Sequence, residues 1–505
     1  MSGVEAEIKL EAPDEFSLPD LDDPGADVLS QPAETVELDA TYFDTTDLRL
    51  ARAGASLRLR SDEGWVVKLP VSLDEGGLLT REEIHVDDAH RNGTAPPDDA
   101  LDLVRALTRN APVDAVARLH TTRRRIRLRS TDARPLGEVV DDHVEVRQGD
   151  SDDVVSMFRE LELELTDQAT DAHRAAVLAL LRRAGAGAAD PTPKIVRALG
   201  PAATGPPDVV VPELDGRHPR VDVVVRRAIA TAVARLLAHD PGARIGKDDE
   251  AVHQARVATR RLRSDLRTFH ELIDERWSND LRDELRWLGD VLGAVRDTDV
   301  LIERLEHNVP ALPEIDQPAA EHVIDRLRRD REAAREQLLR ALRSDRYDAL
   351  LNRLVLAAQR PRLLLRIDDG DDAELMRAAV RRPWERLRAA VDALPADPPD
   401  SALHDIRIRA KRARYAAEAV APAFGKPARA FARALVDVQD VLGEHQDAVV
   451  AGEWLRRAAA QTDRGHEGFA AGELGVLEQQ AAQTSRDAWP GTWDRAARKR
   501  LRSWL

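Results

Sequence analysis

The sequence Glu5-Ala6-Glu7-Ile8-Lys9-Leu10 lies near the start of the chain and alternates charged with apolar side chains. In an extended strand this alternation puts the two carboxylates and the amine on one face and the apolar side chains on the other. If the apolar face packs against covering elements, the charged face lines an interior that suits a metal ion and an anion, because carboxylate oxygens bind Mg²⁺ or Mn²⁺. The alternative is an ordinary strand with a solvated charged face.

The composition excludes several classes of protein. A length of 505 residues favours about two to four domains, and 43% hydrophobic residues are enough for packed cores. We find no apolar run long enough to cross a bilayer and no secretion signal, so we expect a cytoplasmic protein with no membrane partner. The chain has no Cys, which removes disulfides and thiolate chemistry, and its net charge of −16 argues against wrapping nucleic acid.

Further stretches in the first 200 residues carry charges at alternate positions. They hold Arg58 and Arg60, Lys68, Arg81 and Glu83, the series Arg123, Arg125, Arg127 and Arg129, the pair Glu138 and Asp142, and the series Glu160, Glu162 and Glu164. A closed antiparallel sheet has no unpaired edges and can hold a polar interior, so we predict a tunnel of about seven or eight strands. Acidic strands would form a side that holds metal, and basic strands a side that holds an anionic chain.

These residues, with Tyr42-Phe43-Asp44-Thr45 and Lys194, resemble the CYTH domain of triphosphate tunnel metalloenzymes over roughly residues 2–200. The resemblance implies an α+β domain, a closed eight-stranded antiparallel β tunnel with flanking helices, that acts on triphosphates with a divalent metal.

The resemblance also implies site roles. The catalytic residues would be Glu5, Glu7 and Lys9. The triphosphate would bind to Arg58, Arg60, Lys68, Arg81, Arg123, Arg125 and Lys194, and Mg²⁺ or Mn²⁺ to Glu5, Glu7, Asp142, Glu160, Glu162 and Glu164. One metal would bind phosphate oxygens, and a second, if present, would lower the pKa of the attacking water. Which of Arg123, Arg125, Arg127 and Arg129 face the tunnel depends on register, since a slip of one residue exchanges the faces.

Residues 201–218 are rich in Pro and Gly, which predicts a linker between a domain at 1–200 and a second domain at 219–505. Beyond the linker the strand patterns stop and helical periodicity begins. Among the expected helices are two successive pairs, 276–294 with 296–307 and 425–441 with 445–462.

Two segments of this half are repeated. The segment His253-x-x-Arg256-x-x-x-Arg260-Arg261-x-Arg263 returns 151 residues later as His404-x-x-Arg407-x-x-x-Lys411-Arg412-x-Arg414. The segment Asp290-x-x-Gly293-x-x-x-Asp297 returns 150 residues later as Asp440-x-x-Gly443-x-x-x-Asp447. The near-equal offsets indicate a duplicated helical unit. On a helix the basic residues form a stripe apart from the apolar face, free to meet an anion; the alternative is a solvated or ion-paired face.

The repeated segments resemble the CHAD domain over roughly residues 220–505. The resemblance implies an all-α domain of two duplicated helical bundles. It would bind polyphosphate through His253, Arg256, Arg260, Arg261, Arg263, His404, Arg407, Lys411, Arg412 and Arg414. The repeat pairs Arg267 of the first half with position 418 of the second. That position holds Glu418 and not a basic residue, so the second basic stripe is shorter. Because a histidine gains charge below about pH 6.5, we expect stronger binding in mild acid if both imidazoles titrate freely.

The leading hypothesis is a divalent-metal-dependent inorganic triphosphatase acting on tripolyphosphate, fused to a module that binds long-chain polyphosphate. We expect no specific nucleic-acid recognition, and the sequence gives no oligomeric state. One alternative is a non-catalytic polyphosphate-binding adaptor or sensor. Another is a class IV-type adenylate cyclase or a thiamine triphosphatase, although with 4% aromatic residues no pocket for a ring is evident.

Overall fold

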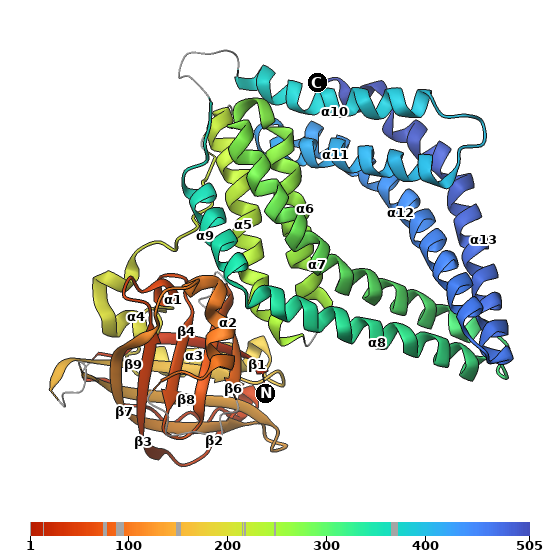
Figure 1. The fold of residues 1–505 in the computed structure, drawn as a ribbon. Coiled ribbons are helices and arrows are strands. Elements are labelled where there is room, and N and C mark those ends of the chain that lie inside the picture. The colour runs from red at the N-terminus through yellow and green to blue at the C-terminus, as the bar shows by residue number, and fades with distance from the viewer. Residues whose placement is uncertain are drawn as a thin grey trace. The chain divides into compact units, whose positions relative to one another are not determined.

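The computed structural model describes residues 2–505 except 14, 74–77, 87–94, 148–152, 215, 217–218, 247–248 and 365–371, with only the backbone of 2–6, 72–73 and 78–79. The chain divides into two compact units, Met1–Asp208 and Val209–Leu505. Figure 1 shows a curled sheet in the first unit and only helices in the second. None of the described helices is both long enough and apolar enough to span a membrane.

Nine strands form one antiparallel sheet in the described part of the N-terminal unit. They are β1 (Ser2–Glu11), β2 (Leu29–Ser30), β3 (Glu34–Asp44), β4 (Ser56–Arg60), β5 (Gly64–Leu73), β6 (Leu78–Val86), β7 (Asp114–Arg129), β8 (Pro135–Arg147) and β9 (Val154–Leu165). Four α-helices accompany them in the same described residues: α1 (Arg49–Arg52), α2 (Asp98–Thr108), α3 (Asp171–Arg183) and α4 (Lys194–Leu199).

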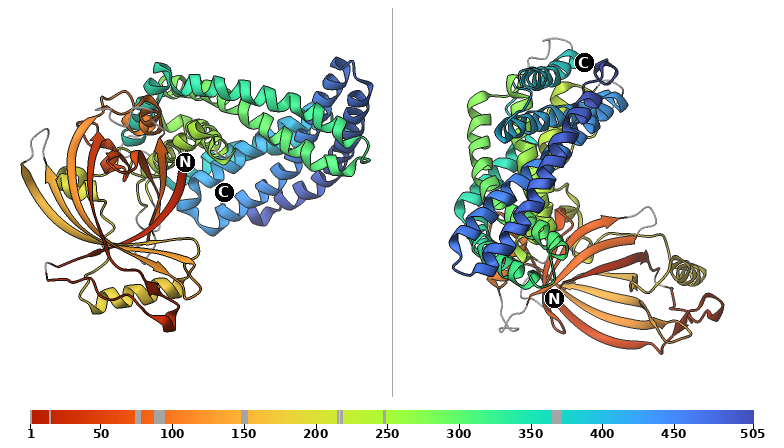
Figure 2. Two further views of the ribbon diagram at one scale, coloured as in Figure 1. Left: turned by 90° about the horizontal axis from the view of Figure 1, so that it is seen from below. Right: turned by 90° about the vertical axis from the view of Figure 1, so that its right-hand side faces the viewer.

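The sheet closes on itself. Its neighbours follow the order β7-β3-β4-β5-β6-β1-β9-β8, and β8 pairs back with β7 from Arg118↔Arg147 to Arg129↔Pro135. The short strand β2 only extends the edge of β7. The predicted closed eight-stranded antiparallel tunnel is therefore confirmed, and the curled strands are seen along their length in Figure 2.

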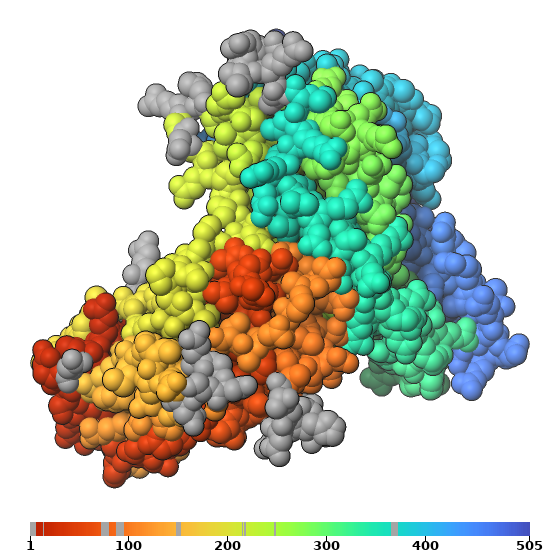
Figure 3. All heavy atoms as spheres, turned by 60° about the vertical axis from the view of Figure 1, so that its left-hand side comes forward, coloured from red at the N-terminus to blue at the C-terminus, as the bar shows by residue number. Residues whose placement is uncertain are grey.

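The alternation of side chains gives the tunnel wall two different faces. Leu161 and Leu163 of β9 are fully buried in an outer core that also holds Ile8 and Leu10 of β1. Helix α3 covers this core and contributes Val177 to it. Figure 3 shows one face of the molecule with all its heavy atoms, on which the residues of the N-terminal unit run from red to yellow. Because a slip of one residue would move charges into the outer core, this packing fixes the register.

Apolar side chains fill one end of the tunnel. Leu119 of β7 and Val144 and Val146 of β8 pack there with Ile195 and Val196 of α4. Each of these strand residues lies an even number of positions from a charged residue on the inner face, so they belong to that face as well. Packing of α4 at this end brings its first residue, Lys194, to the inner wall.

The C-terminal unit is all-α in its described residues. Its helices are α5 (Val221–Ile245), α6 (Asp249–Thr268), α7 (Glu275–Asn308), α8 (Gln317–Leu342), α9 (Asp345–Gln359), α10 (Asp372–Asp392), α11 (Asp400–Phe424), α12 (Lys426–Gln461) and α13 (Gly465–Ala496). The repeated segments fall on α6 and α7 in the first half and on α11 and α12 in the second. In each half the two helices pack against each other, and α6 also contacts α11.

Two of the expected helix boundaries are wrong. The pairs 276–294 with 296–307 and 425–441 with 445–462 are the single helices α7 and α12. Gly293 and Gly443 therefore lie inside helices, where glycine is normally unfavourable. Gly443 gives room to an arginine of the preceding helix, since a methyl group there would lie 3.1 Å from Arg407 Nη2. At Gly293 a methyl group would lie 3.6 Å from Arg256 Nε, an ordinary contact distance.

We expect Leu161→Ala to lower the free energy of unfolding of the N-terminal unit by about 2–5 kcal/mol, because it opens a cavity in the outer core. Met157→Ala on the same strand is the control, since Met157 is 73% exposed, and should change the free energy by less than about 0.5 kcal/mol. Trp65 is the only tryptophan in residues 1–208, so fluorine NMR of fluorotryptophan-labelled protein in urea follows this unit. Equal losses in both variants would contradict the assigned faces.

Candidate functional site

The tunnel encloses a cavity of about 210 Å³ whose lining is almost entirely charged. Its charged lining residues are Glu7, Lys9, Arg58, Arg60, Glu63, Lys68, Arg81, Glu83, His85, Arg123, Arg125, Glu138, Glu162, Glu164 and Lys194. The predicted residues Asp142 and Glu160 lie behind this lining and are fully buried. Glu5 occupies β1 opposite Arg81 of β6, but its side chain lies outside the described residues.

Asp142, Glu160 and Glu162 form a buried carboxylate cluster, with oxygens within 4.8 Å of one another. Lys194 Nζ lies 2.6 Å from Asp142 Oδ2, 2.9 Å from Glu160 Oε1 and 3.0 Å from Glu162 Oε1. Lys9 bonds to both Glu160, at 3.2 Å, and Glu162. The Arg123 guanidinium donates to both oxygens of Asp142 at 2.9 and 2.8 Å. Three cations thus match three carboxylates.

This pairing sets the protonation of the cluster. Burial alone would raise the pKa of Glu162, but Lys194 and Lys9 outweigh burial and hold that pKa well below its usual range. Burial would likewise lower the pKa of Lys9, yet Glu160 and Glu162 raise it above its ordinary value. The pKa of Lys194 is raised in the same way by Asp142 and Glu160. Both amines therefore stay protonated near neutral pH.

A second carboxylate group is formed by Glu7, Glu162 and Glu164, again with oxygens within 4.8 Å of one another. Glu7 Oε1 is buried and makes no hydrogen bond, although Arg81 Nη1 forms an ion pair with it at 3.5 Å; Lys9 Nζ lies 3.7 Å from the other oxygen, Oε2. A buried carboxylate oxygen without a partner is costly unless a ligand satisfies it. Oxygen donors of this kind fit a hard divalent cation such as Mg²⁺ or Mn²⁺.

Two carboxylates, those of Glu63 and Glu83, form ion pairs with cations on the basic side of the tunnel. Arg58 Nη2 lies 2.6 Å from Glu63 and 3.5 Å from Glu83, and Lys68 Nζ lies 3.3 Å from Glu83. Arg60 also reaches Glu63, at 2.8 Å. These carboxylates occupy places on the cations that phosphate oxygens could take.

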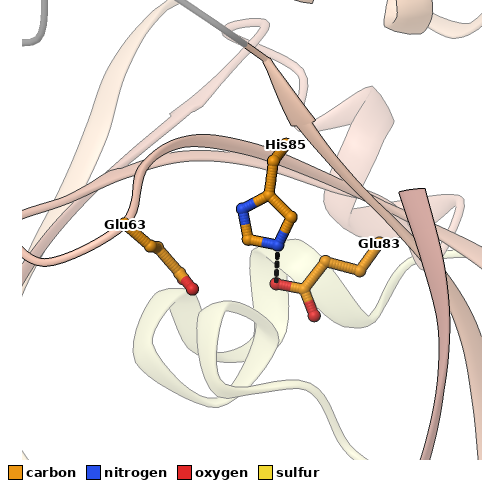
Figure 4. A group of neighbouring side chains, drawn as sticks. All are labelled: Glu63, Glu83 and His85. Atoms are coloured by element: carbon orange, nitrogen blue, oxygen red, sulfur yellow. Dashed lines mark ion pairs between the residues drawn. The ribbon is translucent and has the colours of Figure 1, made fainter. Parts of the chain in front are cut away.

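Glu63, Glu83 and His85 form a third group with the spacing of a metal site (Figure 4). His85 Nε2 lies 3.8 Å from Glu83, and the nearby cations Arg58 and Lys68 already neutralise the two carboxylates. A divalent cation is therefore less favoured here than at Glu7. The sequence interpretation did not include Glu63 or His85. The alternation of Arg81, Glu83 and His85 on β6 would have found the histidine, whereas Glu63 lies in a turn without periodicity.

The register decides which of the four arginines on β7 face the cavity. Arg123 and Arg125 line it. The Arg127 side chain is 55% exposed and lies 3.6 Å from Glu34, and Arg129 is also exposed. Arg127 and Arg129 therefore belong to the open end of the wall and not to the cavity.

In the helical unit the two basic stripes meet. Arg256 and Arg260 of α6 lie close to Arg407 and Lys411 of α11, and we name these four residues the α6/α11 basic cluster. Burial, followed by the charges of Arg260 and Arg407, lowers the pKa of Lys411 to about 7. Arg256 Nη1 pairs with Asp297 at 2.8 Å.

The remaining predicted bases have different surroundings. Arg261 bonds to Asp265 at 3.0 Å and to Glu418, and Arg414 lies 3.4 Å from Glu418. Arg263 and Arg412 lie instead near Arg267, whose pKa burial and its neighbours lower to about 10. Glu418 thus neutralises Arg261 and Arg414 and leaves them less suited to an anion.

The expected behaviour of the histidines is also altered. Burial, followed by the charge of Arg296, lowers the pKa of His253, so this imidazole does not charge freely in mild acid. His404 Nδ1 is buried without a hydrogen-bond partner. The pH dependence expected from freely titrating imidazoles therefore does not apply to His253.

Family models match both halves of the chain, the CYTH domain at residues 3–195 and the CHAD domain at residues 227–456. "Uncharacterized protein Rv2226" of Mycobacterium tuberculosis H37Rv is 34% identical over 507 residues, which cover 96% of this chain and 94% of that protein. The chain belongs to the family that joins a CYTH domain to a CHAD domain. "Uncharacterized protein MT2285" of M. tuberculosis CDC 1551 has the same identity and coverage.

Two solved structures resemble part of this CYTH–CHAD protein. PptA from Streptomyces chartreusis is 24% identical with a TM-score of 0.47, over 55% of this chain and 99% of that one. The CHAD domain from the plant Ricinus communis is 29% identical with a TM-score of 0.45, over 57% of this chain and 95% of that one. Membership of the CYTH family places the N-terminal unit among the triphosphate tunnel metalloenzymes, whose chemistry depends on divalent metals. The CHAD family is associated with polyphosphate.

We expect the CYTH domain to become less stable in acid, in part because protonation of Glu162 removes the stabilisation that its ionised form provides. Its pKa is lower in the folded than in the unfolded chain, so its stabilisation is full above the unfolded pKa of about 4.3 and is lost as pH falls through the folded pKa. Glu162→Gln should make stability less steeply dependent on pH below about pH 4. The Trp65 fluorine signal in urea measures this, with Asp171→Asn as an exposed control. An unchanged slope in Glu162→Gln would contradict the depressed pKa.

Proposed function

We propose that the CYTH domain hydrolyses inorganic tripolyphosphate with Mg²⁺ or Mn²⁺, and that the CHAD domain binds long-chain polyphosphate. The observation that carries the first part is an enclosed cavity with cations on one side and, on the other, a buried carboxylate oxygen of Glu7 that has no hydrogen-bond partner. Such a cavity supplies both requirements of phosphoryl transfer, which are charge neutralisation and positioning.

The metal would be held by Glu7, Glu162 and Glu164, with Glu5 as a further ligand from the same strand. When bound, the cation neutralises phosphate charge and activates water for attack on phosphorus. Asp142 and Glu160 contact the cations behind the wall, so their role is to hold Lys194, Lys9 and Arg123 in place.

The triphosphate would be bound by the basic side of the cavity, from Arg58, Arg60, Lys68, Arg81, Arg123, Arg125 and Lys194. Phosphate oxygens would replace Glu63 and Glu83 on Arg58, Arg60 and Lys68, and guanidinium groups bind such oxygens with paired hydrogen bonds. Lys9 is protonated because its pKa is raised, so it orients phosphate or water and does not act as a base.

An inorganic substrate is favoured over a nucleotide or thiamine triphosphate. Tyr42 is the one Phe, Tyr or Trp among the described residues that line the cavity, His85 adds an imidazole, and the other lining residues are nearly all charged. A base or thiazolium ring needs an apolar or aromatic surface, which this lining does not offer. Product analysis with ATP and thiamine triphosphate separates these alternatives.

In a phosphate-release assay with tripolyphosphate and Mg²⁺, Glu7→Gln should lower kcat by about 100-fold or more, because it removes a metal ligand of the transition state. Arg58→Ala should raise KM by removing a cation that binds phosphate. Arg127→Ala is the matched control outside the cavity and should leave both constants within about twofold.

If the Glu7→Gln variant hydrolysed tripolyphosphate as fast as the parent protein, the proposed metal site at Glu7 would be contradicted. Metal-dependent tripolyphosphate binding without any turnover in the parent would favour the non-catalytic sensor instead.

Polyphosphate affinity of the CHAD domain should fall with rising pH. Lys411 has a pKa of about 7, so it is charged below this pH and loses its charge above it. The Kd for long-chain polyphosphate at constant salt should therefore rise by about tenfold between pH 6 and 8. Lys411→Arg should flatten this dependence.

His253→Gln is the control, because burial and the charge of Arg296 lower the pKa of His253 and so reduce its charge in mild acid. A pH dependence that disappears in His253→Gln but persists in Lys411→Arg would contradict the assignment.

A further inference from the structure

Glu63 lies in the turn between β4 and β5 and places its carboxylate on the basic side of the cavity. Its Oε1 accepts a hydrogen bond from Arg58 Nη2 at 2.6 Å, and its Oε2 lies 2.8 Å from Arg60 Nη2. The Glu63 side chain is 19% exposed, so both ion pairs are largely shielded from water. A single carboxylate thus occupies the two guanidinium groups that β4 presents to the cavity.

The charges of the tunnel are nearly balanced without a phosphate. Among the described residues eight cations and six carboxylates line the cavity, and Asp142 and Glu160 behind the wall bring the number of carboxylates to eight. A condensed phosphate carries more negative charge than one divalent cation neutralises. Because uncompensated buried charge is costly, at least one carboxylate must give up its cations when such a phosphate binds.

Glu63 is better placed to leave its cations than Glu83. Glu83 lies within β6, where its backbone pairs with Lys68 of β5, and its carboxylate lies 3.3 Å from the Lys68 amine. Glu63 belongs to a turn, and a turn opens locally at a smaller cost in free energy than a strand paired on both sides. The Glu63 side chain can therefore turn toward solvent without disturbing the sheet.

A carboxylate in this position weakens the binding of any phosphate that has to displace it. The cost is the same for every such anion, because the two ion pairs that are lost do not depend on what replaces them. Tripolyphosphate tolerates this cost, since other cations of the tunnel hold its remaining phosphate groups at the same time. Orthophosphate and pyrophosphate make fewer of these contacts and are left weakly bound.

We propose that Glu63 is an internal competitor that limits the binding of orthophosphate and pyrophosphate, the products of tripolyphosphate hydrolysis, in the tunnel. An incoming triphosphate takes Arg58 and Arg60 from Glu63, and Glu63 takes them back once the chain has been cut. Glu63 is thus a residue that sets phosphate affinity and product release, and it takes part in no covalent step. The inference rests on the proposed phosphate site of the tunnel but not on turnover there.

Calorimetric titration of the full chain with pyrophosphate in EDTA tests the competition without turnover and without a metal at Glu63, Glu83 and His85. Glu63→Gln keeps the size of the side chain and removes its charge, so the Kd should fall by about tenfold. Asp62→Asn is the matched control. Asp62 lies in the same turn and pairs with Arg60 at 2.6 Å, but it is 47% exposed and does not line the cavity, so the Kd should stay within about twofold.

A double-mutant cycle shows whether Glu63 acts through Arg58. In an Arg58→Ala background, Glu63→Gln should lower the Kd by less than about threefold, because one of the two ion pairs is already gone. Pyrophosphate sites in the CHAD domain are the same in all four proteins and do not contribute to the differences between them.

Kinetics separate this inference from the proposed hydrolysis. With tripolyphosphate and Mg²⁺, Glu63→Gln should lower the Ki of orthophosphate by about tenfold and should not raise kcat, because the products leave more slowly. An unchanged Kd and Ki in Glu63→Gln, with normal turnover in the parent, would overturn the inference and leave the hydrolase intact. Tighter pyrophosphate binding by Glu63→Gln, with no turnover in the parent, would sustain the inference and remove the hydrolase.

Discussion

The N-terminal unit depends on the neutralisation of charges that its own fold buries. Asp142, Glu160 and Glu162 lie within 4.8 Å of one another and away from water, an arrangement that is unstable without cations. Lys9, Lys194 and Arg123 supply these cations from β1, α4 and β7, so the cluster ties together elements distant in the sequence. Glu7 Oε1 makes no hydrogen bond and, among the described residues, has only an ion pair with Arg81 at 3.5 Å, so a divalent cation would satisfy this oxygen.

The alternation of side chains made the wall of the tunnel predictable. Glu160, Glu162 and Glu164 were expected on one face of a strand, and the leucines between them now lie in the outer core. Alternation predicts on which face of a strand a side chain lies, but not how deeply that side chain is buried. Asp142 and Glu160 share a face with lining residues but lie behind the cavity, because long cationic side chains from α4 and from other strands contact them there. Glu63 comes from a turn, where no period exists to reveal it.

In the helical unit, composition and repeat spacing indicated helices and a duplicated basic stripe, but not the contacts between helices. Gly293 and Gly443 were placed near expected helix ends, whereas each lies inside a continuous helix beside an arginine of its neighbour. The pairing of Arg261 with Glu418 joins the two halves of the repeat, and no pattern within one helix could show it. Both cases are tertiary effects that override local propensity.

The central claim is that the tunnel holds a divalent cation on its acidic side, at the carboxylate group formed by Glu7, Glu162 and Glu164. Anomalous scattering from a crystal of the full chain grown with Mn²⁺ and tripolyphosphate tests this claim directly. The account predicts a manganese peak within ligand distance of Glu7, Glu162 and Glu164. A peak at Glu63, Glu83 and His85 alone, or a tunnel that binds no manganese, would contradict it.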